Sequence, residues 1–243
     1  KDSVLNEILG LRDITFPSCR AGDEKSASDL DPSQREAWAL AVSPERKAAL
    51  IHGPPGTGKT AVLERVLRTL CSRGLRILVT APSNTAVDNI CRRCPDLPLL
   101  RFGGIRENIA PDVADKFWIG ELGNVRRFAE LRADRRCGGV YAGTHVGIMK
   151  DPLVNEDLDR NGLFDAIIFD EAGMARPEEF LLCAAMGRAA VVFGDHQQLP
   201  PFPYPAEALR RVREKGRVFT SSMLTLLNES ALEWMVRERG FHS

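Results

Sequence analysis

The sequence has no excess charge of either sign, with 33 lysines and arginines against 33 aspartates and glutamates in 243 residues. This balance provides no general attraction for nucleic acid, so any basic binding surface has to be local. No apolar run approaches the roughly 20 residues that cross a bilayer, which argues against a membrane protein. The six cysteines are scattered and follow no signal peptide. This pattern is typical of reduced thiols in a soluble intracellular protein, cytoplasmic or nuclear.

The cysteines also lack the spacing of a metal site. Cys91 and Cys94 form a lone C-x-x-C pair, with neither a second pair nor histidines nearby. Two neighbours on one helix face explain this spacing better than half of a zinc site does. We therefore expect both to be ordinary helix residues.

Residues 53–60 read G-P-P-G-T-G-K-T, the phosphate-binding loop pattern. A short apolar run at 48–51 precedes them as a buried strand, and apolar residues at helical spacing follow as far as Gly74. The glycines let backbone N–H groups turn toward phosphate oxygens, and the helix start adds its positive partial charge. Lys59 is expected to reach the β- and γ-phosphates, and the Thr60 hydroxyl to ligate Mg²⁺. The complete pattern disfavours a glycine turn without a ligand, and it predicts a nucleotide site made of Gly53, Pro54, Pro55, Gly56, Thr57, Gly58, Lys59 and Thr60.

A second apolar segment, residues 164–170, ends in the adjacent acids Asp170 and Glu171. In a parallel sheet this end lies at the carboxyl edge, where the phosphate loop also opens. Asp170 is expected to hold magnesium, and Glu171 to orient and deprotonate the attacking water. Two solvated acids after a strand are the ordinary alternative, which the upstream phosphate loop disfavours.

Strand-like and helix-like segments alternate along most of the chain. Helical patterns such as residues 83–93 and 177–186 separate the strand candidates, and residues 104–137 are charged and helical, as in an insertion. Alternation of this kind predicts an α/β fold with a parallel sheet covered by helices. The strand candidates are residues 48–51, 76–80, 99–102, 139–143, 164–170 and 189–195.

Three further stretches carry small polar side chains to the same edge: residues 80–90, 140–148 and 193–201. Hydroxyl, amide and backbone N–H donors at helix starts are suited to the phosphates of a passing strand. For any one stretch alone, an ordinary helix cap or turn is the better interpretation.

The set of motifs resembles the superfamily 1 helicases of the up-frameshift-like group. The resemblance runs from Leu30 to Pro201 through LDPSQREAW, GPPGTGKT, APSNTAVDN, GTHVG, DEAG and GDHQQLPP. It implies a RecA-like P-loop NTPase fold with helices on both faces of the sheet. It also implies ATP and Mg²⁺ as ligands, single-stranded RNA or DNA as partner, and ATP-dependent helicase activity.

The resemblance also implies roles for individual residues. Gln34 would read the adenine, and Gln198 would sense the γ-phosphate and couple it to the nucleic acid. Ser83, Asn84 and Thr144 would contact the backbone of a single strand, largely independently of its base sequence. Met174 departs from the family, which usually has a glutamine at this place.

The family's second RecA-like domain has no counterpart among the motifs of this sequence. We therefore expect residues 30–243 to be a first RecA-like domain, with the second domain as a partner in the parent chain and residues 1–29 as the end of a preceding stalk or linker. Such a domain alone would hydrolyse ATP weakly. A phosphate-loop protein that binds nucleotide as a switch, without unwinding, remains the alternative function, and a small-molecule kinase is a more distant one.

Overall fold

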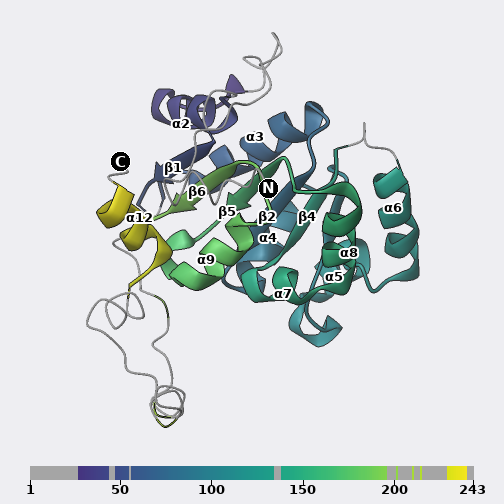
Figure 1. Ribbon diagram of the computed structural model, residues 1–243. Helices are drawn as coiled ribbons and strands as arrows, with labels where there is room; N and C mark the ends of the chain where they lie inside the picture. The colour runs from purple at the N-terminus through teal and green to yellow at the C-terminus, as the bar shows by residue number, and fades with distance from the viewer. Residues whose placement is uncertain are drawn as a thin grey trace.

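The computed structural model describes residues 27–43, 47–54, 56–133, 138–195 and 229–239, with the single positions 201, 210 and 214. Within these residues, six strands form one sheet in the order β1-β6-β5-β2-β4-β3, and every neighbouring pair is parallel (Figure 1). This confirms the predicted α/β class. The strands are β1 Ala48–His52, β2 Ile77–Ala81, β3 Leu99–Arg101, β4 Val140–Thr144, β5 Ala166–Phe169 and β6 Ala190–Gly194.

Helices cover both faces of the sheet, as Figure 1 shows. One face packs against helices α2 Pro32–Val42, α3 Lys59–Ser72, α4 Asn84–Arg93 and α5 Pro111–Phe117. The other face packs against α6 Leu122–Ala133, α7 His145–Lys150, α8 Pro152–Asn161, α9 Pro177–Ala184 and α12 Ala231–Arg239. Strand residues alternate between the two cores: Ile77 and Val79 join the first, whereas Leu78 joins the second. Burial on both faces explains why the strands read as continuous apolar runs.

The segment predicted as a helical insertion contains the short 3₁₀ helix η2 Arg106–Asn108 followed by α5 and α6. It is not set apart from the sheet. Phe117 of α5 enters one core and Phe128 of α6 enters the other, and Trp118 between them forms a single parallel bridge with Arg101 at the end of β3. The segment therefore extends both layers of the same body.

The parallel arrangement brings the carboxyl ends of all the strands to one edge. The phosphate loop leaves β1, Asp195 follows β6, and Asp170 follows β5. Next along this edge, Ser83 follows β2 and Thr144 ends β4, where it pairs in register with Ala81. Residues more than 100 positions apart in the sequence therefore meet on one side of the molecule.

The turn after β3 lies directly against the first turn of α7. Gly103 and Gly104 both have positive φ, 71° and 78°, which side-chain-bearing residues rarely adopt. A Cβ on Gly103 would lie 2.7 Å from the Cα of Gly147, whereas a Cβ on Gly104 would meet nothing within 4 Å. The two glycines thus share a positive φ and differ in the space around their Cα atoms.

This difference makes a matched pair of substitutions. We expect Gly104→Ala to lower the free energy of unfolding by about 1 kcal/mol, the usual cost of left-handed backbone for alanine. Gly103→Ala should cost about 2 kcal/mol more, because the methyl group has to displace the backbone of α7. Urea unfolding followed by circular dichroism measures both, and equal losses would contradict the close packing at Gly103.

Candidate functional site

The phosphate loop ends where α3 begins. Gly58, with φ 81°, is the N-cap of this helix, and Lys59 and Thr60 are its first two residues. The Lys59 ammonium donates a hydrogen bond to the Gly53 carbonyl, so its side chain folds back over the loop. Thr57 Oγ1 donates to the Pro54 carbonyl (2.8 Å), which closes the turn. The predicted loop residue Pro55 lies outside the described residues.

Asp170 and Glu171 lie within the electrostatic reach of Lys59. Burial, and then the charge of Glu171, raise the pKa of Asp170 to about 6, and the Glu171 N–H and Lys59 only partly oppose this. Burial also raises the pKa of Glu171, again against the charge of Lys59. A buried carboxylate without enough positive charge around it is favourable for a divalent cation. Asp170, with Thr60 at the start of α3, therefore fits the predicted Mg²⁺.

The backbone at Glu171 is unusual. Its φ of 52° and ψ of 38° are left-handed, and among the described residues it is the one non-glycine residue with positive φ. The Glu171 N–H donates to Asp170 Oδ1 (3.0 Å), a contact that helps to hold this conformation. Strained backbone of this kind, about 1 kcal/mol or more, concentrates at functional sites.

Gln34 lies against the phosphate loop. Its side chain closes a capping box at the start of α2, accepting from the Asp31 N–H (3.3 Å), while its amide Nε2 donates to the Thr57 carbonyl (3.0 Å). A Cβ added to Gly58 would collide with this amide. Both amide atoms of Gln34, the side chain predicted to read adenine, therefore already have hydrogen-bond partners within the chain. Its contact with the base stays a prediction.

A contact that the sequence analysis missed joins the ends of β1 and β6. His52 Nε2 lies 3.2 Å from Asp195 Oδ1, and the Gly53 N–H donates to the Gly194 carbonyl (3.3 Å). The first residue of the phosphate loop is thereby tied to the strand that leads toward Gln198, which itself lies outside the described residues. No local pattern reveals that β1 and β6 are neighbours, so no sequence signal pointed to this pair.

Two of the three residues predicted to contact nucleic acid are helix caps. Ser83 Oγ accepts from the Ala86 N–H (3.2 Å) at the start of α4, and Thr144 Oγ1 accepts from the Gly147 N–H (3.1 Å) at the start of α7. The third, Asn84, accepts through Oδ1 from Arg101 Nη2 (2.7 Å). Both caps lie at the ends of the neighbouring strands β2 and β4, and β2 also neighbours β5, the strand that Asp170 follows. Contact with a strand stays a prediction.

Comparisons with known proteins identify relatives of this chain. The protein family described as AAA domain matches residues 29–117. The DNA replication ATP-dependent helicase/nuclease DNA2 of Saccharomyces cerevisiae is 31% identical, over 71% of this chain and 11% of that protein. The DNA-binding protein SMUBP-2 of Mesocricetus auratus is 50% identical, over 71% of this chain and 22% of that protein. The chain belongs to the superfamily 1 helicases of the up-frameshift-like group.

This chain spans only 11% and 22% of the length of those two helicase-family relatives. Among solved structures, a nuclease-deletion mutant of the Type ISP restriction-modification enzyme LlaGI in complex with a DNA substrate mimic matches with a TM-score of 0.49. It is 21% identical over 68% of this chain and 17% of that chain. Met174 occupies the position where this family usually has a glutamine, and it lies in η3 Ala172–Met174, directly after Glu171.

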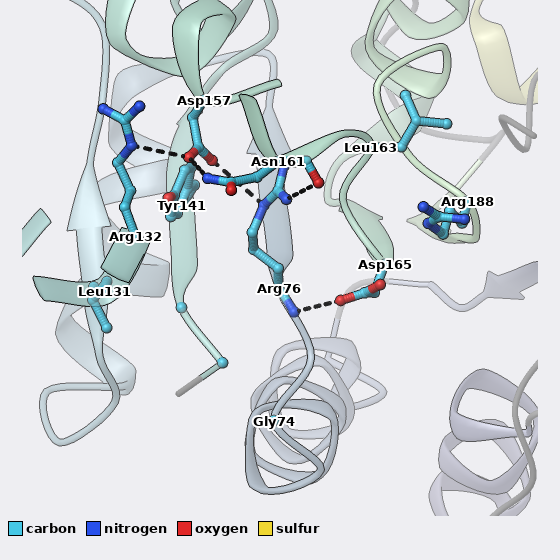
Figure 2. A pocket seen from close by; sticks show the side chains of 12 residues that line it. Gly74, Arg76, Leu131, Arg132, Tyr141, Asp157, Asn161, Leu163, Asp165 and Arg188 are labelled. Carbon is cyan, nitrogen blue, oxygen red and sulfur yellow. Dashed lines mark hydrogen bonds and ion pairs between the residues drawn. The ribbon is translucent and has the colours of Figure 1, made fainter. Parts of the chain in front are cut away.

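A pocket of about 200 Å³ lies at the opposite, amino edge of the sheet, beneath the starts of the strands (Figure 2). Figure 2 shows Asp157 between Arg132 and Arg76, whose Nε atoms lie 3.2 Å and 3.4 Å from its carboxylate oxygens. Asn161 also donates to Asp157 (2.7 Å). The Asp157 carboxylate thus forms ion pairs with both Arg76 and Arg132, which line the pocket. The pocket is not the nucleotide site, because the phosphate loop lies across the sheet from it.

Cys91 and Cys94 lie at the end of α4, in the core beneath it. Burial raises the pKa of both thiols to about 12, so that they stay protonated and serve as small apolar residues. Over the part of the chain that the structure describes, no cluster of three or more metal-ligating side chains occurs. In the same part, every helix is too short or too polar to cross a bilayer.

The buried charge of Asp170 predicts a pH-dependent stability. Its folded pKa of about 6 exceeds the ordinary 3.8, so the folded chain holds the proton more tightly than the unfolded chain. The stability that this proton provides is complete below about pH 4 and is lost as the pH rises through about 6. Asp170→Asn should therefore raise the free energy of unfolding by about 1–3 kcal/mol near pH 7.5 without magnesium, and by much less near pH 4.

Urea unfolding at the two pH values measures this effect. Asp159→Asn removes the same charge from an exposed position on α8 and serves as the control, with little change expected at either pH. A destabilised Asp170→Asn variant near pH 7.5 would show that partners within the chain stabilise the Asp170 carboxylate in its charged form.

Proposed function

We propose that this chain is the ATP-binding motor domain of an ATP-dependent RNA or DNA helicase. In the full-length protein, ATP hydrolysis would drive movement along a single strand inside the cell. The observation that supports this most is the meeting of Lys59 with Asp170 and Glu171 at one sheet edge, beside the predicted strand-contacting residues. The relatives named above as a helicase and a DNA-binding protein favour the same interpretation.

Each residue of the edge takes a definite part in this proposal. Lys59 exchanges its contact with the Gly53 carbonyl for the β- and γ-phosphates, a charge-assisted and stronger partner. Thr60 and Asp170 hold Mg²⁺, which supplies charge stabilisation to the phosphates. Glu171 orients the attacking water and accepts its proton, and its raised pKa suits a base that works near neutral pH.

Two glutamines complete the nucleotide chemistry in this proposal. Gln34 releases the Thr57 carbonyl and turns its amide toward the adenine edge, so ATP is preferred over GTP. Gln198 senses the γ-phosphate at the end of the segment that Asp195 begins. The His52–Asp195 contact would transmit movement of the phosphate loop to that segment.

Single-stranded nucleic acid is the proposed partner at the ends of β2 and β4. Ser83, Asn84 and Thr144 lie at two helix starts there, where phosphates are favoured by the helix dipole. The second RecA-like domain of the parent chain would close over the same edge. Binding as a nucleotide switch without unwinding is the alternative, and it would leave the polar groups at β2 and β4 as caps alone.

The nucleotide site is tested by removing the lysine. Lys59→Ala should weaken Mg-ATP binding by at least about tenfold, because contacts to charged phosphate are among the strongest hydrogen bonds in proteins. Isothermal titration calorimetry measures the affinity. Arg65→Ala, which removes a positive charge farther along α3, is the control and should bind nearly as the parent does. Equal affinities for the parent and Lys59→Ala would refute the assignment.

The rate of ATP hydrolysis distinguishes a helicase motor domain from a nucleotide-binding switch. In phosphate-loop enzymes an arginine finger contributes about 10³–10⁵ in rate, and this family supplies it from the second RecA-like domain. We therefore expect residues 1–243 to bind ATP yet release phosphate slowly, while a chain that includes a second domain is stimulated by single-stranded RNA or DNA. Phosphate release with and without oligonucleotide measures this. An absence of stimulation in the longer chain would favour the switch.

A further inference from the structure

Arg101 ends β3 and is the bulkiest side chain that the described part of the chain buries completely, with 0% of its surface exposed. Its guanidinium makes three contacts. Nε donates to Asp88 Oδ1 (3.3 Å), Nη1 to the Phe102 carbonyl (2.5 Å) and Nη2 to Asn84 Oδ1 (2.7 Å). The one nearby carboxylate, Asp88, also accepts from the Ala110 N–H (2.9 Å). The buried cation therefore links the end of β3 to the start of α4.

The contact with Asn84 determines which way its amide faces. A guanidinium carries only donors, so the atom of Asn84 that meets Nη2 has to be the oxygen. The planar amide then directs its NH₂ group away from Arg101. Among the described residues this NH₂ group has no hydrogen-bond partner, and Asn84 is partly exposed. Two donors on the first residue of a ten-residue helix thus remain for another partner.

We propose that Arg101 is a positioning residue for the nucleic-acid site: it holds the Asn84 amide with its donors facing the phosphates of a bound strand. This inference rests on the proposed function and adds to it a buried residue that touches no ligand. A free amide samples both orientations in the unbound chain, with either its oxygen or its nitrogen turned outward, and has to be ordered when a phosphate binds its nitrogen. With Arg101 behind it, Asn84 can only donate, and it does so at a helix start that favours anions.

The planar guanidinium of arginine suits this positioning role, whereas the single ammonium of lysine does not. Its separate nitrogens reach Asp88 and Asn84 at once, in fixed directions. A fully buried arginine with one carboxylate is costly compared with an apolar residue of similar size. The contact with Asn84 is the part of the cluster that reaches the surface. We therefore assign to the buried arginine the orientation of the Asn84 amide.

Asn84→Asp separates the positioning role from a structural one. One oxygen of the introduced carboxylate keeps the Arg101 contact and strengthens it, so the unfolding temperature should not fall. The other oxygen faces outward as an acceptor and repels phosphate. We expect about tenfold weaker binding of a short fluorescein-labelled oligothymidylate at low ionic strength, measured by fluorescence anisotropy.

Asn89→Asp is the matched control, since it makes the same charge change in the same helix at an exposed position five residues farther on. Its affinity should stay within about twofold of the parent, because exposed charges act weakly over such distances. In the parent, the side-chain NH₂ resonances of Asn84 should shift on addition of the oligonucleotide. Arg101→Lys, which keeps the charge but not the fork, should weaken binding about as much as Asn84→Asp does.

The outcomes separate this inference from the function on which it rests. If the parent fails to bind the oligonucleotide, the proposed nucleic-acid site is wrong and the inference falls with it. If the parent binds and Asn84→Asp binds equally well, the positioning role of Arg101 is wrong while the proposed function stands. An Arg101→Lys chain that does not fold leaves the decision to the Asn84→Asp and Asn89→Asp pair.

Discussion

The parallel direction of all six strands is the constraint on which the rest of this structure depends. Because every strand ends at the same edge, the polar residues that follow the strands collect there without any need for proximity in the sequence. The phosphate loop, Asp170 and Thr144 come from three separate strands and occupy one edge. The apolar strands between two layers of helices make this edge rigid, so the polar groups on it are held in fixed relative positions.

Buried charges are compensated to different degrees at the ends of β3 and β5. At β3 the buried Arg101 is matched by Asp88 and an amide, and the cluster is complete within the chain. At β5 two acids share the charge of one lysine, and burial raises the pKa of both. The two acids at β5 are therefore not fully compensated, and they lie where phosphates and a divalent cation are proposed to bind together. The Arg101 cluster at β3 is compensated within the chain, and it lies on the side proposed to bind nucleic acid, where we propose that it orients the neutral amide of Asn84.

The segments on which the predicted nucleotide site depends can be recognised in the sequence because their signals are local. Eight consecutive residues specify the phosphate loop, and an apolar run followed by acids specifies the end of β5. Helix caps are local too, and the structure gives Ser83 and Thr144 the ordinary capping contacts that any hydroxyl at a helix start can make. The strand positions followed from apolar runs of buried length, so the six candidates overlap the six strands.

What the sequence by itself determined is therefore the strand segments, the phosphate loop, the paired acids and the membership of a helicase family. The first three depend on consecutive residues, and the last depends on six short motifs in a fixed order along the chain. Only the tertiary structure decided which strands are neighbours. That order places His52 beside Asp195, lays Gln34 on the phosphate loop, and buries Arg101 behind Asn84. Such contacts join residues far apart in the chain, and their partners are selected by packing of the whole sheet rather than by any local pattern.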